Sequence, residues 1–179
     1  MSSNKALGLV HVYTGDGKGK TTAAFGLALR AVGNGLSVSI IQFMKALSPE
    51  SGEIVAIKGL ENVKVKRYGG NLLGKGHPPF ENIKSETAKG IDEALQIAKN
   101  RSCDLLILDE INVAVFMRLV GIGEALKIVG LCKNNFIELV MTGRNAPQEF
   151  IDIADYITEF KMVKHPFKAG IAARRGIEF

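Results

Sequence analysis

Short runs of apolar and β-branched residues alternate along this chain with longer segments that place apolar residues every three or four positions. The short runs predict β-strands, and the longer segments predict helices. The expected strands cover residues 8–13, 36–43, 63–68, 103–110, 136–141 and 156–163. The expected helices cover residues 23–32, 49–58, 81–100, 111–120, 123–133 and 147–154. This alternation indicates one mostly parallel sheet with helices on both faces, which is a three-layer α/β fold.

Residues 69–80 form the one long segment without a regular pattern. Four glycines and two prolines oppose a helix there. Connections of this length are usually functional lids or surface loops. Because the segment carries Leu72, Leu73 and Phe80, we expect a lid that packs on an apolar ligand. A surface loop without a ligand is the alternative.

The composition narrows the class of protein. A chain of 179 residues is long enough for one domain, residues 1–179, with a sizeable core. No apolar run approaches the roughly 20 residues of a membrane span, and the N-terminal stretch is not typical of a secretory signal. Cys103 and Cys132 lie in separate apolar segments. We therefore expect reduced, buried thiols and a cytoplasmic protein.

The charged residues give a formal net charge of +5, from 23 Lys and Arg against 18 Asp and Glu, spread along the chain. This modest excess is compatible with an ordinary solvated surface or with attraction of a polyanionic small molecule such as a nucleoside triphosphate. No basic segment rich in aromatic residues points to nucleic acid. We therefore expect neither a nucleic-acid partner nor a membrane partner.

The main candidate for a binding site lies between the first expected strand and the first expected helix. A strand, a glycine loop, Gly-Lys-Thr and a helix are the context of a phosphate-binding loop in P-loop NTPase-like folds. Glycines let successive N–H groups turn toward an anion, and the helix adds the positive end of its dipole. Lys20 adds a full positive charge, and Thr21 is placed to bind Mg²⁺. The expected phosphate-binding residues are Gly15, Asp16, Gly17, Lys18, Gly19, Lys20, Thr21 and Thr22.

The spacing of this loop differs from the usual pattern G-x-x-x-x-G-K-[ST]. Counting back from Gly19, the first glycine belongs at position 14, where this chain has Thr14, and the nearest glycine is Gly15. The loop is therefore one residue short, and it contains an acid, Asp16, and a second lysine, Lys18. A strand-to-helix turn that is merely rich in glycine is the alternative interpretation.

A second group of polar residues is expected at the same edge of the sheet. Asp109 and Glu110 directly follow four apolar residues of a strand, as do the acids that hold Mg²⁺ beside a phosphate loop. Asn112 follows closely, and Arg144 ends the next strand, where open α/β sheets bind ligands. Arg144 is therefore a candidate contact to phosphate or base. The alternatives are that the acids cap a helix and that Arg144 forms a surface ion pair.

Several stretches of this sequence together resemble one family, the ATP:corrinoid adenosyltransferases of the cobalamin pathway. The short loop Gly-x-Gly-Lys-Gly-Lys-Thr-Thr is itself a mark of that family. The matching stretches follow the family order over nearly the whole chain. They are residues 15–24, 29–33, 42–45, 108–112, 142–147, 154–159, 164–167 and 176–179.

The resemblance implies transfer of the 5′-deoxyadenosyl group of ATP to the cobalt of a corrinoid (cobalamin, cobinamide or cobyrinic acid a,c-diamide), with release of triphosphate. It also implies Mg²⁺ as cofactor, a reduced flavoprotein or similar electron donor, and a homodimer. Co(I) is already a strong nucleophile, so the enzyme mainly positions the substrates and stabilises the leaving triphosphate. On this view Lys20, Thr21 and Glu110 are catalytic. Thr21, Asp109 and Glu110 hold Mg²⁺.

The chain departs from the family pattern in one segment. Many members carry an aromatic Phe-Thr-Trp segment after the third strand, thought to pack beneath the corrin. This chain has no Trp and offers residues 69–80 instead. Our hypothesis is that Leu72, Leu73 and Phe80 supply the apolar surface there, with Asn112 also on the corrinoid side.

Two other functions are compatible with the residues alone. A small-molecule kinase or NTPase needs only the phosphate loop and the two acids, although the chain lacks an Arg-rich lid and a guanine-specifying Asn-Lys-x-Asp. A nucleotide-dependent protein that holds a corrinoid without chemistry is the non-enzymatic alternative. The product distinguishes the enzymes, because the transferase releases triphosphate and the others release ADP or phosphate.

Overall fold

The computed structural model describes residues 7–45, 51–70 and 78–178 of the chain. Within these ranges the strands are β1 (Val10–Thr14), β2 (Val38–Lys45), β3 (Val63–Gly69), β4 (Leu105–Asp109), β5 (Glu138–Thr142) and β6 (Tyr156–Glu159). The helices are α1 (Lys20–Gly33), α2 (Gly52–Ile57), α3 (Phe80–Asn100), α4 (Ile111–Phe116), α5 (Ile122–Asn134) and α6 (Gln148–Ile153), followed by the 3₁₀ turn η1 (Pro166–Ala169). In these ranges no helix has both the length and the apolar character that a membrane span needs.

The strands form one sheet in the order β3-β2-β4-β5-β1-β6, and every neighbouring pair is parallel. The expected parallel α/β sheet is thereby confirmed, and β3 lies at one edge of it. The carboxyl ends of all strands meet at one edge. The register places Gln42 of β2 opposite Asp109 of β4, and Tyr13 of β1 opposite Thr142 of β5. Polar residues from four strands therefore reach the same edge.

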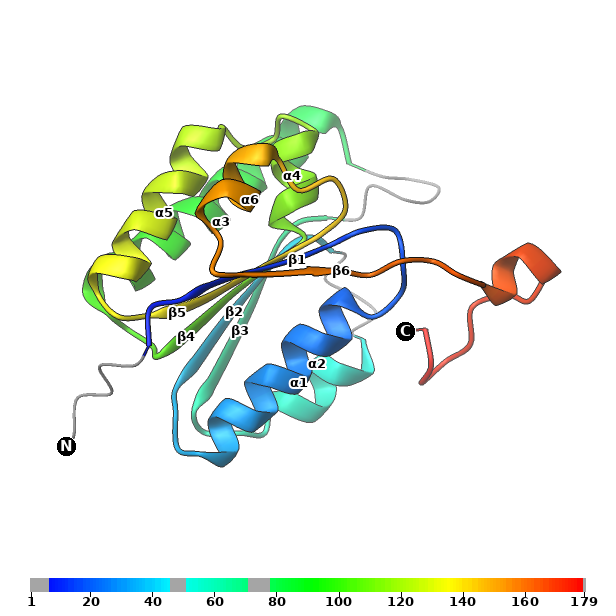
Figure 1. Ribbon diagram of the computed structural model, residues 1–179, viewed down its shortest axis with the longest axis horizontal. Helices are drawn as coiled ribbons and strands as arrows, with labels where there is room; N and C mark the ends of the chain where they lie inside the picture. Colours follow the sequence, from blue (N-terminus) through cyan, green and yellow to red (C-terminus); the bar gives the residue numbers. More distant parts are fainter. Residues whose placement is uncertain (1–6, 46–50, 71–77, 179) are drawn as a thin grey trace.

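Helices cover both faces of the sheet: α1 and α2 lie on one face, and α3, α4, α5 and α6 lie on the other (Figure 1). The two cores use alternate residues of the buried strands. In β4, Leu106 and Leu108 belong to the core with α3 and α5, whereas Leu105 and Ile107 belong to the core with α1 and α2. Because β4 is buried on both faces, its sequence is an unbroken apolar run, as is typical of parallel sheets.

Most elements begin and end close to their predicted positions, and the exceptions have physical causes. α1 begins at Lys20 instead of residue 23, because Gly-Lys-Thr already forms the first helical turn. In this turn the Ala23 N–H donates to the Gly19 carbonyl over 2.7 Å. α4 ends at Phe116 instead of residue 120, since the chain leaves the helix and Arg118 adopts a positive φ of 59°.

The last strand is also shorter than predicted. β6 ends at Glu159, whereas its pattern predicted a strand through residue 163. The Phe160 N–H still donates to the Thr14 carbonyl over 2.8 Å, but the Phe160 carbonyl accepts from the Gly17 N–H over 2.6 Å. The backbone that would continue the strand therefore binds the loop that follows β1.

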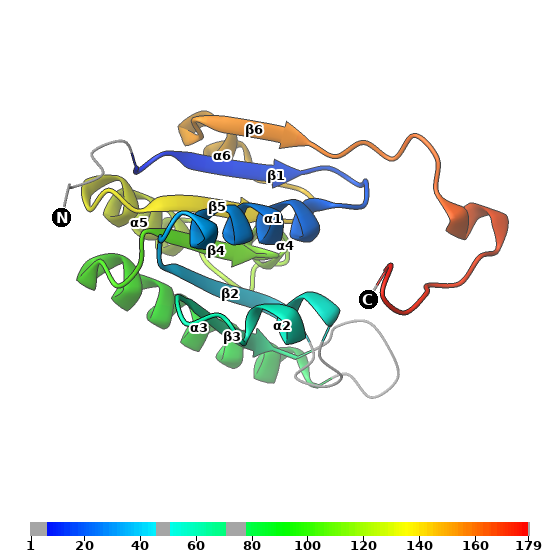
Figure 2. The same cartoon turned by 90° about the horizontal axis from the view of Figure 1, so that it is seen from below.

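The residues after β6 extend away from the body of the molecule and then turn back, as Figures 1 and 2 show. The 3₁₀ turn η1 lies within this tail. The Lys18 ammonium donates to the Ile177 carbonyl over 2.7 Å. This contact ties the far end of the tail to the loop that follows β1.

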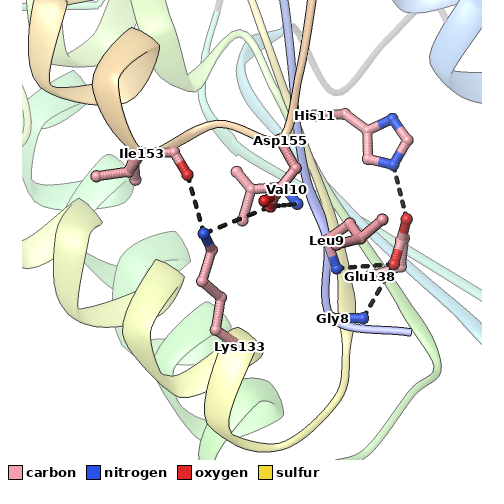
Figure 3. Close-up of polar contacts among 8 residues, drawn as sticks. All are labelled: Gly8, Leu9, Val10, His11, Lys133, Glu138, Ile153 and Asp155. Atoms are coloured by element: carbon pink, nitrogen blue, oxygen red, sulfur yellow. Dashed lines mark hydrogen bonds and ion pairs between the residues drawn. The ribbon is translucent and has the colours of Figure 1, made fainter. Parts of the chain in front are cut away.

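The opposite edge of the sheet, where the strands begin, is held by side chains that bind backbone groups (Figure 3). Glu138 Oε2 accepts from the N–H groups of Gly8 and Leu9, each over 3.0 Å. Glu138 Oε1 lies 2.7 Å from His11 Nε2, and the His11 ring stacks on Tyr156 with 4.4 Å between ring centroids. These contacts fasten the start of β1 to β5 and β6.

Candidate functional site

The loop between β1 and α1, residues 15–19, curls tightly and is hereafter the glycine loop. Gly15 and Gly19 have φ values of 92° and 122°, which residues with side chains rarely adopt. A Cβ atom at Gly17 would lie 2.6 Å from the Phe160 carbonyl oxygen, which is too close without a backbone shift. The geometry of the loop therefore requires these glycines, whatever ligand it binds.

Lys20 is the first residue of α1 and is only 8% exposed. Its Nζ donates to the carbonyl oxygens of Gly15 (2.6 Å) and Gly17 (2.9 Å), so the charge lies inside the curl of the glycine loop. Burial lowers the pKa of Lys20, and the nearby Glu110 carboxylate partly opposes this shift. A buried cation held by backbone carbonyls at a helix N-terminus can exchange them for the oxygens of a bound phosphate.

Asp109 is the centre of a hydrogen-bond network at the end of β4 and is completely buried. Its Oδ1 accepts from Thr21 Oγ1 over 2.9 Å and from Thr142 Oγ1 over 2.6 Å. Its Oδ2 accepts from Gln42 Nε2 over 2.9 Å. The donors come from α1, β5 and β2, so one carboxylate connects the helix after the glycine loop with both strands that flank β4.

Glu110 follows directly and has a positive φ of 66°, a conformation that persists only where neighbouring groups hold it. Its N–H donates to Thr142 Oγ1 over 3.1 Å. Burial raises the pKa of Glu110, the Asp109 carboxylate raises it further, and Lys45 and Lys20 act in the opposite direction. Glu110 occupies the N-cap position of α4, yet its side chain makes no capping hydrogen bond. Capping therefore does not account for this acid.

The other charged residues predicted to bind phosphate lie at the mouth of the glycine loop. Asp16 Oδ1 lies 3.8 Å from Arg144 Nε, and both side chains are more than half exposed. The surface ion pair considered for Arg144 is therefore present. Lys18 is exposed and donates to the Ile177 carbonyl, and Thr22 is exposed in the first turn of α1. Arg144 and Lys18 would have to leave these protein partners to contact a phosphate.

Asn112, predicted on the corrinoid side, is completely buried. Its Nδ2 donates to the carbonyls of Tyr13 (3.3 Å) and Gly143 (3.0 Å). It therefore ties the ends of β1 and β5 together. Its side chain is enclosed here, and its place on the corrinoid side stays a prediction.

Of the other residues predicted on the corrinoid side, Phe80 alone lies within the described residues. Phe80 begins α3 and is 45% exposed, and Leu72 and Leu73 lie outside the described residues. β3 is separated from β1 by three strands in the sheet order. A cavity of about 390 Å³ lies between the end of β3 and the start of α3. Its lining residues are Arg67, Gly69, Gly70, Pro78, Asn82, Ile83, Ser85 and Glu86.

Two members of the network, Gln42 and Thr142, were not predicted as site residues. Both are buried, and both bind Asp109. In the sequence each is a polar residue near the end of a largely apolar strand, and each begins a stretch that matches the family pattern, residues 42–45 and 142–147. Among the residues that the structure describes, Gln42 Oε1 and Asn112 Oδ1 are buried without a hydrogen-bond partner. A buried oxygen without a hydrogen bond costs free energy, so we expect water or a ligand to donate the missing hydrogen bond.

The side chains of Thr21, Asp109 and Glu110 supply a hydroxyl and two carboxylates to this edge. Oxygen donors of this kind suit Mg²⁺, which proteins hold through one or two carboxylates together with substrate phosphates. A hydroxyl that donates its proton, as Thr21 does to Asp109, keeps its lone pairs for a cation. Across the described ranges, no group of three or more His, Cys, Asp or Glu side chains could hold a metal ion. The hydroxyl and carboxylate oxygens of Thr21, Asp109 and Glu110 are of the kind that Mg²⁺ bound jointly with phosphate would use.

The chain is similar to known proteins along nearly its whole length. The family described as ATP:corrinoid adenosyltransferase BtuR/CobO/CobP matches residues 6–179. A corrinoid adenosyltransferase of Escherichia coli (strain K12) is 34% identical over an alignment of 179 positions, which spans 96% of this chain and 86% of that protein. The corresponding proteins of Pseudomonas aeruginosa and Sinorhizobium sp are 33% and 30% identical over 173 residues. These matches cover 96% of this chain and 84% and 80% of the respective relatives.

Proposed function

The chain belongs to the ATP:corrinoid adenosyltransferase family, and we propose that it transfers the 5′-deoxyadenosyl group of ATP to the Co(I) centre of a corrinoid. In this reaction a cobalt–carbon bond forms and the C5′–O bond of ATP breaks. Co(I) supplies the electron pair and becomes formally Co(III), and triphosphate leaves. The reaction serves cobalamin synthesis or salvage.

The observation that carries this proposal is the family match over residues 6–179. A glycine loop next to two acids is also compatible with kinases and other NTPases, because a shared fold does not determine the reaction. Membership of this family does not favour the kinase, the NTPase or the non-catalytic corrinoid-binding protein.

In this proposal the glycine loop binds the triphosphate, on which negative charge grows as the C5′–O bond breaks. Lys20 and the N–H groups at the start of α1 provide fixed positive charge at this place. Lys18 and Arg144 add to it when they exchange the Ile177 carbonyl and Asp16 for phosphate oxygens. Asp16 then acts by holding Arg144 at the mouth of the loop before ATP binds.

Thr21, Asp109 and Glu110 are the residues that would hold Mg²⁺. The ion would neutralise part of the charge of the leaving triphosphate. Asp109 also accepts hydrogen bonds from Thr21, Gln42 and Thr142, so it orients the Thr21 hydroxyl as well. Glu110 provides the second carboxylate of the set.

No protein base is needed in the proposed reaction, because the Co(I) of the substrate is the nucleophile. The chain has to position C5′ against the cobalt and to hold the phosphate charge. A reduced flavoprotein or similar donor supplies the electrons that produce Co(I). We also propose a homodimer and a cytoplasmic location, and the free, buried thiols of Cys103 and Cys132 agree with a reducing compartment.

We place the apolar surface for the corrin at the end of β3 and the start of α3. Phe80 is the exposed aromatic side chain of this region, and Pro78 and Ile83 contribute apolar lining to the neighbouring cavity. Leu72 and Leu73, which lie outside the described residues, belong to the same proposal. Contact beneath the corrin would help cobalt to lose its lower ligand, which makes Co(II) easier to reduce.

The proposed reaction is tested by anaerobic incubation with ATP, Mg²⁺ and chemically reduced cobinamide, with the corrinoid spectrum and the phosphate product followed together. We expect the Co(I) band to disappear with one triphosphate per adenosylated corrinoid. Lys20→Ala should lower the rate by about 10²- to 10³-fold, as does loss of a donor that stabilises developing charge. Lys127→Ala, an exposed lysine on α5, is the control and should leave the rate unchanged.

An unchanged corrinoid spectrum together with ADP and phosphate would contradict the proposal. The same assay, started from the Co(II) substrate with an electron donor, tests the corrinoid side. There Phe80→Ala and Leu73→Ala should lower turnover, while Phe136→Ala, a similarly exposed phenylalanine before β5, should not. Unchanged turnover in the first two variants would remove these residues from the corrinoid site.

A further inference from the structure

Thr142, at the end of β5, forms hydrogen bonds to both acids of the site through one hydroxyl group. The hydroxyl donates to Asp109 Oδ1 over 2.6 Å and accepts from the Glu110 N–H over 3.1 Å. Thr142 is completely buried. It reaches both acids because β4 and β5 pair in parallel, with Leu108 opposite Met141, so that Thr142 follows beside Asp109.

The contact with Glu110 bears on the backbone of this residue. The chain turns out of β4 at Glu110 with a φ of 66°. A residue with a side chain keeps this conformation only where its surroundings hold it. The hydroxyl of Thr142 receives the N–H at this turn and so contributes to the direction in which the Glu110 side chain leaves the strand.

The contact with Asp109 bears on the orientation of its carboxylate. Oδ1 accepts from Thr142 and Thr21, and Oδ2 accepts from Gln42. Donors on both oxygens leave the carboxylate one orientation that satisfies all three hydrogen bonds. Loss of the Thr142 hydroxyl would remove the shortest of these contacts, and the Thr21 hydroxyl would lose part of its fixed partner.

We propose that Thr142 is a positioning residue that fixes Asp109 and Glu110 relative to each other, so that Thr21 and Glu110 are presented together to a phosphate-bound cation. Thr142 acts through the two acids and touches no reacting atom. The test by kcat for adenosyl transfer rests on the proposed function. The test by Mg²⁺-dependent nucleotide binding does not. Partners of this kind, which orient ligand side chains, typically change metal affinity or activity by about 10- to 100-fold when they are lost.

The test compares two substitutions at this position. Thr142→Val removes the hydroxyl and keeps the shape of the side chain, whereas Thr142→Ser keeps the hydroxyl. Thr87→Val is the matched control, because Thr87 is also completely buried and its hydroxyl donates to the Ile83 carbonyl within α3 over 2.7 Å. Each protein is measured for thermal unfolding, for binding of a fluorescent ATP analogue as a function of Mg²⁺, and for kcat and KM in adenosyl transfer.

We expect Thr142→Val to raise the Mg²⁺ concentration for half-maximal nucleotide binding by about 10-fold and to lower kcat by about 10- to 100-fold. Nucleotide affinity measured in the presence of a chelator should not change. Thr142→Ser should stay within about 3-fold of the unmodified protein in both readouts. Thr87→Val should lower the unfolding temperature without changing the Mg²⁺ dependence.

An unchanged Mg²⁺ dependence in Thr142→Val would overturn the proposal, as would an equal change in Thr142→Ser or Thr87→Val. If Thr142→Val does not fold, Thr142→Ala is compared with Thr142→Ser by the same criterion. If the unmodified protein transfers no adenosyl group, the proposed function fails. The Mg²⁺ dependence of nucleotide binding still decides the role of Thr142 in that case.

Discussion

At the start of the strands, Glu138 accepts hydrogen bonds from two backbone N–H groups and pairs with His11. At their carboxyl ends, Asp109 accepts hydrogen bonds from three side chains. The first arrangement satisfies backbone groups and joins neighbouring strands (Figure 3). The second gathers acids, a lysine and two orphaned amide oxygens, Gln42 Oε1 and Asn112 Oδ1, in a buried place. The same sheet thus uses buried polar groups for cohesion at one edge and for a candidate site at the other.

The pKa values of the acids shift in opposite directions at the two edges. Burial alone would raise the pKa of Glu138, but hydrogen bonds from His11 and from the N–H groups of Leu9 and Gly8 outweigh it, and the pKa is lowered. At Glu110, burial and the Asp109 carboxylate together prevail, and the pKa is raised. A carboxylate with a lowered pKa stabilises the fold when ionised, and one with a raised pKa destabilises it. At the carboxyl edge the fold therefore keeps an acid, Glu110, whose ionised form lowers the free energy of unfolding.

The strongest test of this comparison makes the same substitution at each edge, beginning with Glu110→Gln. We expect kcat for adenosyl transfer to fall by about 10²-fold, because a carboxylate of the cation site is lost. The free energy of unfolding at pH 7 should stay the same or rise by up to about 1 kcal/mol, because a destabilising buried charge is removed. Turnover and urea unfolding measure the two effects. A marked fall in the free energy of unfolding would show that the Glu110 carboxylate stabilises the fold.

A second test concerns the backbone at the carboxyl edge. Gly17→Ala places a Cβ atom 2.6 Å from the Phe160 carbonyl oxygen. The glycine loop or the segment after β6 must shift, so the free energy of unfolding should fall by about 1 to 3 kcal/mol. Binding of the fluorescent ATP analogue should weaken as well.

The matched control for this substitution is Gly26→Ala in the exposed part of α1, where a Cβ atom would meet no described atom within 4 Å beyond the adjoining backbone of its own helix. Alanine is the better helix former, so this variant should gain about 0.5 to 1 kcal/mol in the free energy of unfolding. Urea unfolding of both variants gives the comparison. Equal stability of the two would contradict the close packing of Phe160 on the glycine loop.

The smallest effect is expected at the amino edge, from Glu138→Gln. The free energy of unfolding at pH 7 should fall by about 1 to 2 kcal/mol, because the substitution weakens the hydrogen bonds of a largely buried carboxylate. Turnover should stay within about twofold. The stabilisation by Glu138 is fully present above its unfolded pKa of about 4.5 and is lost as the pH falls through the lowered folded value. The difference between the two proteins should therefore shrink below pH 4.5.

The control at this edge is Lys133→Met. Lys133 Nζ lies 3.4 Å from Asp155 Oδ2, and both side chains are at least one-third exposed. An exposed pair of this kind should contribute about 0.5 kcal/mol or less. Urea unfolding at pH 7, 5 and 3 follows both variants. A pH-independent difference for Glu138→Gln would show that its charge is not what stabilises this edge.

Much of the fold could be predicted because its elements depend on local patterns. The apolar run of β4 predicted a strand, and α3 was predicted nearly to the residue. Errors occur where a distant contact ends an element. β6 ends early because Phe160 binds the glycine loop, and nothing in residues 160–163 indicates that partner.

The candidate site could be predicted in part. Thr21 and Asp109 are joined by a hydrogen bond, and Lys20 lies close enough to Glu110 for their charges to interact. Motifs at the ends of parallel strands made this proximity predictable, and the roles of these residues in binding and catalysis stay predictions. Asn112 has a buried structural position that its place after the acids did not indicate.

The sequence by itself determined the alternation of strands and helices, the glycine loop, the pair of acids and the resemblance to a family, because each depends on residues close together in the chain. The tertiary structure alone decided that Gln42 and Thr142 bind Asp109, across separations of 67 and 33 residues. These contacts depend on the order β2-β4-β5 and on the parallel register. A polar residue at a strand end becomes part of a site only through the strand that folding places beside it.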